Sequence, residues 1–435
     1  MRKLSKYNIF HQNGENLHII NTQSGAMMII PDHSKEDLLA YLDEESSISK
    51  KLCDNSIIVN DDIDESETAN IRFYEYVNQN DLHVVIMPTF DCNFRCRYCF
   101  EKSNNLRLDH DTEEGIKNFL RVRSRKTKNL YITWFGGEPL LEIDRTLPLM
   151  EYFQNLSRTY GVCLKQNMIT NGFYLTSQLA NKLCGYGCTH FQITLDGFKE
   201  THDYLRPLAD GSGTFDRIIS NLREIRESTT SKKLRILIRV NITKRLGNEL
   251  ERFVDFLNTE FLVDSRFSVM WRRASDWDGS ISSDMKQDLC GAMGWKYYIN
   301  SLRECHPSWR GHISIIKPFG SICGCVHKNF YAIGPDGKVF RCLSNMYTQD
   351  STEVGYLKPT GEMVLNRAAT DVWRIKREST RCQNCAVYPS CFSMNCPAQT
   401  VYDYERECPR DKEILMTIIE GLAEDSSLWT FLDID

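Results

Sequence analysis

The sequence lacks a strong excess of charge of either sign. Its 53 Lys and Arg residues are nearly balanced by 58 Asp and Glu residues, which leaves a net charge of -5 over 435 residues. Proteins that bind nucleic acid displace counterions with a basic surface, and this chain has no basic excess to supply one. The charge balance therefore argues against a nucleic-acid partner.

Long apolar runs are also absent. No stretch of about eighteen apolar residues occurs, so we expect no membrane span. The basic start Met1–Lys6 is not followed by an apolar run of signal-peptide length, so we expect no export signal either. Cysteine, in contrast, is abundant, with 17 residues. So many thiols without an export signal predict metal or redox chemistry in a reducing cytoplasm rather than disulfides.

The residue pattern divides the chain into three parts, at 1–80, 81–305 and 306–435. The first part has strand patterns around the turn Asn13–Gly14, then helical patterns and a last strand. In chain order, these patterns cover residues 7–11, 17–21, 26–31, 34–42, 48–52 and 56–60. The acidic run at 61–67 is typical of a linker. We therefore expect a small strand-and-helix module at the N-terminus.

The middle part alternates strands with helices. Strand patterns lie at 83–88, 130–135, 164–170, 190–195, 234–243 and 266–271. The first helix is expected at 111–123, opened by a capping box of Asp111 and Glu114. Such alternation predicts a parallel sheet, either open or curled into a partial barrel. Chemistry in such folds gathers at the C-terminal ends of the strands.

Three thiols follow the first of these strands. Cys92, Cys96 and Cys99 are spaced so that a loop leaving the strand can wrap them around one small object. Three soft ligands suit a four-iron cluster, which would then keep one iron open for another molecule. A zinc knuckle and a set of buried core cysteines are the alternatives, although zinc sites favour paired Cys-x-x-Cys units and four protein ligands.

The pattern Cys-x-x-x-Cys-x-aromatic-Cys, with Tyr98 as the aromatic residue, resembles the radical S-adenosylmethionine (SAM) enzymes. The resemblance implies that Cys92, Cys96 and Cys99 hold a four-iron, four-sulfur cluster and that SAM chelates its open iron. It also implies reductive cleavage of SAM to a 5'-deoxyadenosyl radical, with an electron donor such as flavodoxin or ferredoxin.

Further motifs lie at the ends of the next strands. Gly136, Gly137 and Glu138 follow the second strand, and by the same resemblance they bind the SAM amino group. A simple strand-to-helix turn is the alternative reading of these residues. Thr194 ends the fourth strand with a hydroxyl that would face the SAM carboxylate or ribose, whereas Asp196 fits a turn residue equally well. In the fifth strand, Arg239 and Asn241 share one face of the sheet, and we expect Asn241, together with Arg239, to contact SAM.

The last part contains a second group of thiols. Cys323 and Cys325 precede a hairpin that is expected to turn at 335–337 and to lead to Cys342. Cys382, Cys385, Cys391, Cys396 and Cys408 follow. These eight thiols could form two four-ligand sites, either zinc ribbons or clusters.

Together with the upstream thiols, the C-terminal group resembles the SPASM extension, which holds two auxiliary four-iron clusters. Cys342 and Cys396, with Cys323 or Cys325 or both, would then bind the first auxiliary cluster. Cys382, Cys385, Cys391 and Cys408 would bind the second, for a total of three 4Fe-4S clusters.

Two departures from this pattern affect the chemistry. The last cysteine pair is separated by four residues, 392–395, instead of the usual three, which bears on the geometry around Cys396. Leu343 stands where sulfatase-maturating relatives carry an acidic residue, so the base expected for formylglycine formation is missing.

The fold class predicted from these features is α/β. It comprises a partial (β/α)6 TIM-like barrel, an N-terminal winged-helix-like module and a C-terminal SPASM extension. The N-terminal module is similar to the peptide-recognition element of ribosomal-peptide maturases, which binds a leader peptide as an added strand. A packing extension with no binding role is the alternative for this module.

The predicted function is oxidative crosslinking, through a thioether or a C-C bond, of a ribosomally made precursor peptide. One alternative is maturation of a folded protein of the sulfatase or quinohaemoprotein type. Another is a non-catalytic, zinc-stabilised peptide-binding protein.

Overall fold

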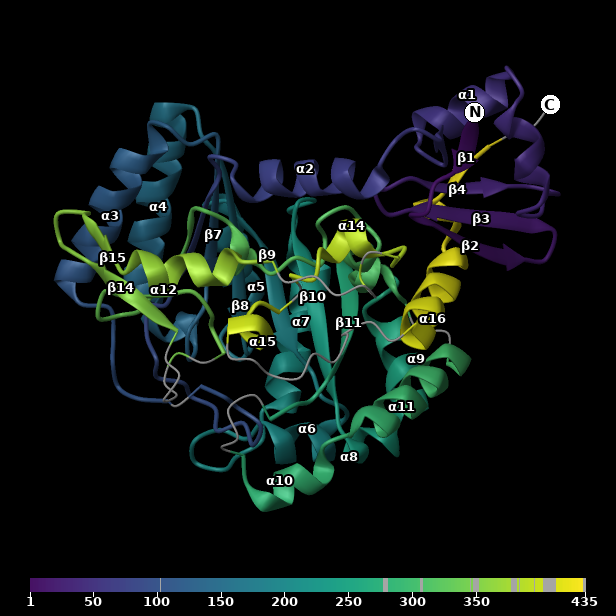
Figure 1. Cartoon of the computed structure of the whole chain (residues 1–435). Helices are drawn as coiled ribbons and strands as arrows, with labels where there is room; N and C mark the ends of the chain where they lie inside the picture. The colour runs from purple at the N-terminus through teal and green to yellow at the C-terminus, as the bar shows by residue number, and fades with distance from the viewer. Residues whose placement is uncertain are drawn as a thin grey trace. The chain divides into compact units, whose positions relative to one another are not determined.

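The computed structural model describes residues 1–101, 103–276, 281–305, 308–344, 346, 352–376, 382, 384–394, 396–401 and 412–432. The chain forms two compact units. The barrel unit comprises Asn80–Ser308 and Lys328–Trp373, and the terminal unit comprises Met1–Gln79, Trp309–His327 and Arg374–Asp435. Figure 1 traces both along the chain. None of the described helices is long and apolar enough to cross a membrane.

Six parallel strands form the centre of the barrel unit. They are β6 (Leu82–Ile86), β7 (Asn129–Trp134), β8 (Cys163–Thr170), β9 (Cys188–Thr194), β10 (Arg235–Ile242) and β11 (Phe267–Arg273). Each pairs in parallel with the next strand in sequence. Every second residue of β7, namely Leu130, Ile132 and Trp134, is fully buried, as expected for a strand with one face against helices.

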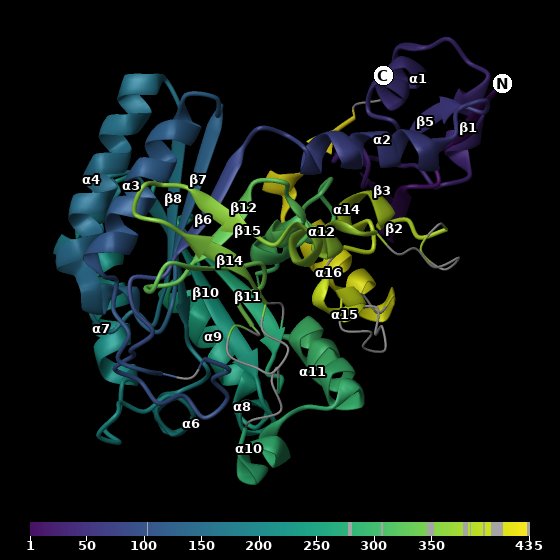
Figure 2. The same cartoon turned by 60° about the vertical axis from the view of Figure 1, so that its left-hand side comes forward.

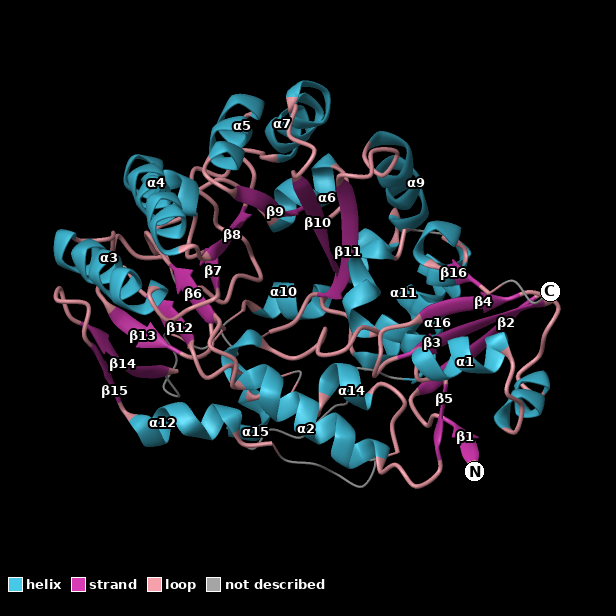
Figure 3. Cartoon of the chain, turned by 90° about the horizontal axis from the view of Figure 1, so that it is seen from above, coloured by secondary structure: helices cyan, strands magenta, loops and turns pink. Residues whose placement is uncertain are grey.

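Helices cover the outer face of this curved row of strands, where Figure 3 shows α3, α4, α5, α7 and α9. The helices of this region are α3 (His110–Ser124), η2 (Pro139–Glu142), α4 (Ile143–Tyr160), α5 (Ser177–Gly185), α6 (Lys199–Leu205), α7 (Phe215–Ser228), α8 (Lys244–Gly247), α9 (Leu250–Glu260), α10 (Ser283–Asp288) and α11 (Ala292–Glu304). The predicted partial barrel of six strand-helix units is confirmed.

The sheet continues beyond β6 with four later strands. β12 (Phe330–Ile333) pairs in parallel with β6, and β13 (Lys338–Phe340), β14 (Glu353–Leu357) and β15 (Met363–Leu365) follow in antiparallel order. Figure 2 shows β12, β14 and β15 beside β6. The predicted hairpin turn ends at Gly337, whose φ of +77° favours glycine. α12 (Arg367–Asp371) and η5 (Val372–Arg374) then lead out of the sheet.

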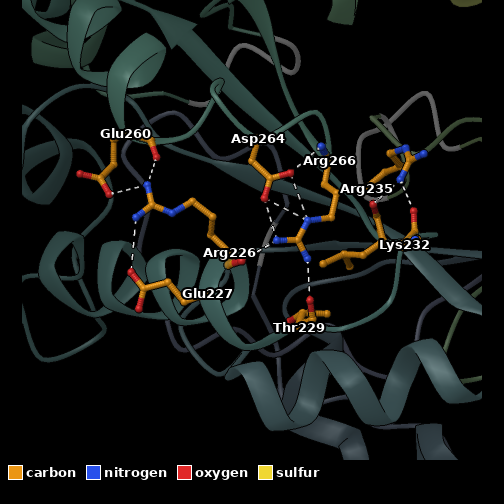
Figure 4. A network of polar contacts seen from close by, with 9 residues as sticks. Arg226, Glu227, Thr229, Lys232, Arg235, Glu260, Asp264 and Arg266 are labelled. Atoms are coloured by element: carbon orange, nitrogen blue, oxygen red, sulfur yellow. Dashed lines mark hydrogen bonds and ion pairs between the residues drawn. The ribbon is translucent and has the colours of Figure 1, made fainter.

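A network of arginines fixes the end of the barrel where β10 and β11 begin (Figure 4). Arg266, just before β11, pairs with Asp264 at 2.7 Å and donates to the carbonyl of Thr229 at 2.7 Å. Arg226 on α7 pairs with Glu260, the last residue of α9, at 3.1 Å. These contacts join both helix ends to the start of β11, at the opposite end of the strands from the predicted chemistry.

The terminal unit contains two small sheets. β2 (Asn8–Asn13), β3 (Asn16–Asn21), β4 (Met27–Ile30) and β16 (Thr430–Phe431) form one sheet in the order β16-β4-β3-β2. β1 (Arg2–Leu4) pairs with β5 (Ile58–Asn60) in the other. The predicted hairpin at Asn13–Gly14 is present. Sequence reasoning missed β16, which appears in Figure 1 as the yellow strand beside the purple β4.

Helices complete the terminal unit. They are η1 (Asp37–Leu42), α1 (Ser47–Asp54), α2 (Glu65–Val77), η3 (Arg310–Ile315), η4 (Gly324–Val326), α14 (Tyr388–Cys391), α15 (Ala398–Val401), α16 (Lys412–Ala423) and η6 (Ser426–Leu428). Nine buried residues from both ends of the chain form one core: Leu17, Ile19, Met28, Ile30, Leu38, Leu52, Ile57, Ile58 and Leu432.

Two N-terminal predictions were wrong. The acidic run at 61–67 is not a linker, because Asp64 accepts hydrogen bonds from the Ser66 and Glu67 amides and so starts the helix α2. The helix expected at 34–42 is a shorter 3-10 helix. It begins only at Asp37, because the carboxylate of that residue holds the amide and hydroxyl of Ser34 in a turn.

The predicted capping box of the first barrel helix was also wrong. Asp109 caps α3 by accepting from the amide of Thr112 at 2.6 Å. Asp111, which was expected to be the cap, lies in the first turn, where its charge suits the helix dipole instead.

Candidate functional site

One cavity of about 350 Å³ lies at the C-terminal ends of the parallel strands. Nine of the ten residues predicted to act in the radical chemistry line it: Cys92, Cys96, Tyr98, Cys99, Gly136, Gly137, Thr194, Arg239 and Asn241. The lining also includes Arg206, Arg273 and Leu343. Segments far apart in sequence therefore meet where the parallel-sheet rule predicts.

The paired glycines let two loops approach each other closely. A β-carbon at Gly136 would collide with the carbonyl oxygen of Thr89, and one at Gly137 with that of Asp91. The amides of Gly137 and Glu138 donate to those same carbonyls at 3.1 and 2.9 Å. The glycines are therefore required for packing against the cysteine loop, defined here as Asp91–Phe100.

Glu138 lies behind the cavity wall. It is fully buried, and its carboxylate accepts hydrogen bonds from the Thr170 hydroxyl at 2.6 Å and from the Asn171 amide at 2.7 Å. It also accepts from the Leu140 amide at 3.1 Å. Burial raises its pKa, and these hydrogen bonds oppose the rise. Glu138 thus ties the end of β7 to the end of β8, and its assignment as a SAM contact stays a prediction.

The cysteine loop is clamped by the end of α6 and the segment that follows it. Phe94 and Leu208 form an antiparallel bridge. The amide of Arg95 donates to the Pro207 carbonyl at 2.8 Å, and that of Arg97 to the Leu205 carbonyl at 2.9 Å. The Arg97 guanidinium also lies 4.1 Å from the ring centre of Tyr204. Residues 204–208, to which the sequence analysis gave no role, therefore fix the backbone that carries the thiols.

Tyr98 connects the cysteine loop to the ends of β9 and β10. Its hydroxyl hydrogen-bonds to the Asp196 carboxylate and accepts from Arg206 at 2.8 Å and from the Asn241 amide group at 3.2 Å. Asp196 in turn accepts from the backbone amide of Asn241 at 2.7 Å. Asn241 also accepts from Arg239 at 2.9 Å, so the predicted polar pair of β10 is joined to this network.

Asp196 and Arg206 are site residues to which the sequence analysis gave no role. Asp196 is fully buried, which excludes a simple exposed turn residue, and burial raises its pKa despite the nearby Arg206. Arg206 is 7% exposed and lines the cavity, and its Nε has no hydrogen-bond partner within the described part of the chain. A buried cation with a free donor at a cavity wall favours an anionic ligand.

The thiols lie in surroundings that suppress their charge. Burial, with a smaller effect of Glu138, raises the pKa of Cys92 to about 12. Burial also raises the pKa of Cys96 and of Cys99. Thiolates form readily here only with a positive partner such as iron. Within the described ranges, no three His, Cys, Asp or Glu side chains lie close enough to hold one metal ion. A four-iron cluster is different, because each thiolate binds a separate iron.

The C-terminal cysteines belong to two different units of the structure. Cys342 follows β13 in the barrel unit, and the terminal unit contains Cys323, Cys325, Cys382, Cys385, Cys391 and Cys396. Cys408 is outside the described residues. The amide of Cys323 donates to the carbonyl of Met394 at 3.0 Å, so the backbone at Cys323 lies beside the turn that follows Cys391. Their grouping into two clusters stays a prediction.

The backbone turns sharply directly after Cys391. Phe392 and Ser393 both have left-handed φ values, of 49° and 59°, directly after α14. Two such residues in succession are costly for side chains other than glycine. The Phe392 ring is 1% exposed and stacks on Phe73 of α2 at 4.9 Å, which holds the turn in place.

Comparisons with known proteins agree with the site. Residues 86–257 match the model of the radical SAM superfamily. The cysteine-type anaerobic sulfatase-maturating enzyme of Clostridium novyi is 23% identical over 72% of this chain and 87% of its own length. Fe-coproporphyrin III synthase of Methanosarcina barkeri is 26% identical over 41% of each chain, less than half of that relative.

Solved structures resemble the fold. The structure of anSMEcpe with bound AdoMet and a peptide has a TM-score of 0.57, at 15% identity, over 80% of this chain and 99% of that one. Streptococcus suis SuiB bound to its precursor peptide SuiA has a TM-score of 0.51, at 15% identity, over 95% of this chain and 100% of that one. Residues 86–257 therefore match the radical SAM pattern, and the cavity brings the motifs of that segment together.

Proposed function

We propose that this enzyme installs an oxidative crosslink, a thioether or a C-C bond, in a ribosomally made precursor peptide. In the proposal Cys92, Cys96 and Cys99 hold the 4Fe-4S cluster. Tyr98, Gly136, Gly137, Glu138, Thr194 and Asn241 form the SAM site. When bound, cluster and SAM supply a 5'-deoxyadenosyl radical that abstracts hydrogen.

The residues of the chain position and shield this chemistry. The clamp between 93–97 and 205–209 fixes the thiol-bearing backbone, and the Tyr98 network fixes it to β9 and β10. Arg206 offers a buried cationic donor to an anionic group such as the SAM carboxylate. Apolar side chains such as Phe135, Ile169 and Leu343 line part of the cavity, where they would shield a reactive radical from water.

The choice between crosslinking and formylglycine formation rests on Leu343. It lines the cavity directly after Cys342, where sulfatase-maturating relatives have an acidic residue. An aliphatic side chain cannot take a proton, which disfavours oxidation of a serine or cysteine to formylglycine. Closing a crosslink releases one hydrogen atom from the attacked carbon, which the 5'-deoxyadenosyl radical would take, and one proton and one electron from the partner group. A partner thiol held as a thiolate would have lost that proton before the bond closes, so a base beside Cys342 is not required.

The surplus electron requires an acceptor, and the C-terminal cysteines support one. We propose that Cys342 and Cys396, with Cys323 or Cys325 or both, bind one auxiliary cluster. Cys382, Cys385, Cys391 and Cys408 would bind the other. With a cytoplasmic flavodoxin or ferredoxin as the first donor, electrons would enter and leave through iron-sulfur centres. The 17 cysteines favour this reducing compartment.

The sheet of the terminal unit supports a peptide substrate. A leader peptide adding as a strand would bind leader and core as one bivalent ligand. The core peptide would then meet the cavity at an effective concentration of roughly millimolar. The peptides bound to SuiB and anSMEcpe agree with such a substrate class.

The test is anaerobic reconstitution followed by reaction with candidate precursors from short open reading frames beside the gene. We expect about twelve irons per chain, 5'-deoxyadenosine formation, and a product that has lost two hydrogens per crosslink. Formylglycine in a sulfatase peptide would instead support maturation of a folded protein. Colourless, zinc-containing protein without SAM cleavage would overturn catalysis altogether.

A further inference from the structure

The N-terminal sheet is completed by a strand from the other end of the chain. β16 runs parallel to β4, with Thr430 opposite Met28 and Phe431 opposite Ile29, and the Leu432 amide donates to the Ile29 carbonyl at 2.9 Å. Without β16, the edge of β4 would present unpaired backbone groups of the kind to which an extended peptide adds. The chain itself therefore occupies this edge (Figure 1).

Two side chains hold β16, one on each face of the sheet. Leu432 is 2% exposed and lies in the core with Leu17 and Met28. Trp429 is 7% exposed and meets His18 edge to face, with ring centres 4.7 Å apart. Phe431 between them is 53% exposed. In this chain, the edge of β4 therefore holds an aromatic residue and, three residues later, a leucine.

An ion pair on the surface fixes the segment that precedes β16. The Arg310 guanidinium pairs with both carboxylate oxygens of Asp425 and donates to the Ser427 hydroxyl at 2.9 Å. Exposed pairs of this kind contribute little stability, so opening this contact is easy. The strand itself is short, with two residues in register, and the residues that flank it, Trp429 and Leu432, are buried.

We propose that β16 is a resident strand in the leader-binding edge and that a precursor peptide enters by taking its place. This inference rests on the proposed leader-binding role of the sheet. The entering peptide presents an aromatic side chain to His18 and, three residues later, an aliphatic side chain to the pocket of Leu432. Because β16 occupies the edge, the peptide binds only to molecules whose edge is open. Its apparent affinity is therefore the intrinsic affinity multiplied by the fraction of open molecules. It also protects the sheet from pairing with wrong partners.

The test uses the chain's own tail as the probe. A fluorescent synthetic peptide with the sequence Asp425–Leu432 is titrated onto three full-length proteins: wild type, Trp429→Ala/Leu432→Asp, and Phe431→Asp. The double variant removes both buried side chains that flank β16, so β16 should no longer pair with β4. Phe431→Asp is the matched control, because that side chain is 53% exposed. We expect the double variant to bind the probe at least about 10-fold more tightly than the other two. A scrambled peptide should bind none of them.

Equal binding by all three proteins, or failure of the double variant to bind while its far-ultraviolet spectrum stays native, would overturn the proposal. Hydrogen exchange on the wild-type protein gives a second measurement that needs no variant. The Leu432 amide should exchange about 10-fold or more faster than the β3 amides, because a resident strand opens without the sheet. Equal exchange rates for the Leu432 amide and the β3 amides would show that β16 does not open separately from the sheet. That result would contradict the proposal.

These outcomes are separable from those of the proposed function. An enzyme that binds the tail probe after unseating but modifies no precursor would keep this inference and lose the peptide-crosslinking role. The opposite result is an enzyme that crosslinks its precursor at the same rate and the same low concentration whether or not β16 is paired with β4. It would keep the peptide-crosslinking role and overturn this inference.

Discussion

The two main sheets of this chain are built in opposite ways. In the barrel unit, six parallel strands follow one another in sequence and each pairs with its neighbour. In the terminal unit, the first strands of the chain form a sheet that one of its last segments completes. The first sheet is specified by local order and the second by contacts between distant segments. The chemistry should therefore depend on the barrel, and the stability of the N-terminal sheet on the C-terminal segment.

The largest expected effect tests whether the chemistry depends on the barrel unit. Replacing Cys92, Cys96 and Cys99 together by Ala should abolish 5'-deoxyadenosine formation and leave about two thirds of the iron. Thermal unfolding of the terminal unit should not change, because the thiols lie in the barrel unit. Cys163→Ala, at an exposed thiol of β8, is the control. SAM cleavage by the triple variant would show that these thiols are not the catalytic centre.

A smaller change in the same unit tests the close approach of two loops. In Gly137→Ala, the added methyl group meets the carbonyl of Asp91 and must displace the cysteine loop. Misplacement of a reacting group by about 1 Å can cost roughly 100-fold in rate, and we expect a loss of that order in SAM cleavage. Gly185→Ala is the control, since its β-carbon meets nothing within 4 Å. Equal rates for both variants would mean that the glycine pair only forms a turn.

Tyr98→Phe should have a more selective effect. It removes the hydroxyl that joins Asp196, Arg206 and Asn241 and keeps the ring. Loss of hydrogen bonds to charged groups is worth about 1.5–3 kcal/mol, so we expect the KM for SAM to rise at least about 10-fold. Iron content should stay normal, and the change that SAM causes in the electron paramagnetic resonance of the reduced cluster should be altered. Tyr174→Phe, at a residue that is 40% exposed, is the control. An unchanged KM and spectrum would remove Tyr98 from the SAM site.

A substitution in the C-terminal segment tests whether that segment stabilises the N-terminal sheet. Leu432→Ala should lower the free energy of unfolding of the terminal unit by about 2–4 kcal/mol, because it leaves a cavity in that core. Phe431→Ala, one residue earlier but exposed, should change it by less than about 0.5 kcal/mol. SAM cleavage should be the same in both. A deletion of residues 1–80 would be a poorer experiment, since it would uncover Trp429 and Leu432 as well.

The same contrast explains what the sequence could predict. All six parallel strands and the cavity residues could be placed, because periodicity and strand-to-loop order are local signals. Asp196 and Arg206 received no role, because their partners come from the cysteine loop and from β10, and one sequence does not display such side-chain pairings. β16 was missed for a related reason. A two-residue strand has no periodicity, and its pairing with β4 joins the two ends of the chain.

The smallest expected effect concerns the contact that precedes β16. Hydrogen bonds from Arg310 lower the pKa of Asp425 in the folded chain. A carboxyl group with a depressed folded pKa stabilises the fold above its unfolded pKa of about 3.9, and this stabilisation is lost as the pH falls through the folded value. Arg310→Ala should therefore cost under about 1 kcal/mol at neutral pH, and the difference from wild type should vanish in acid. Chemical unfolding at several pH values measures this, with Lys51→Ala, an exposed residue of α1, as the control. A deficit that persists unchanged below about pH 3 would mean that Arg310 acts through packing of its stem and not through the charge of Asp425.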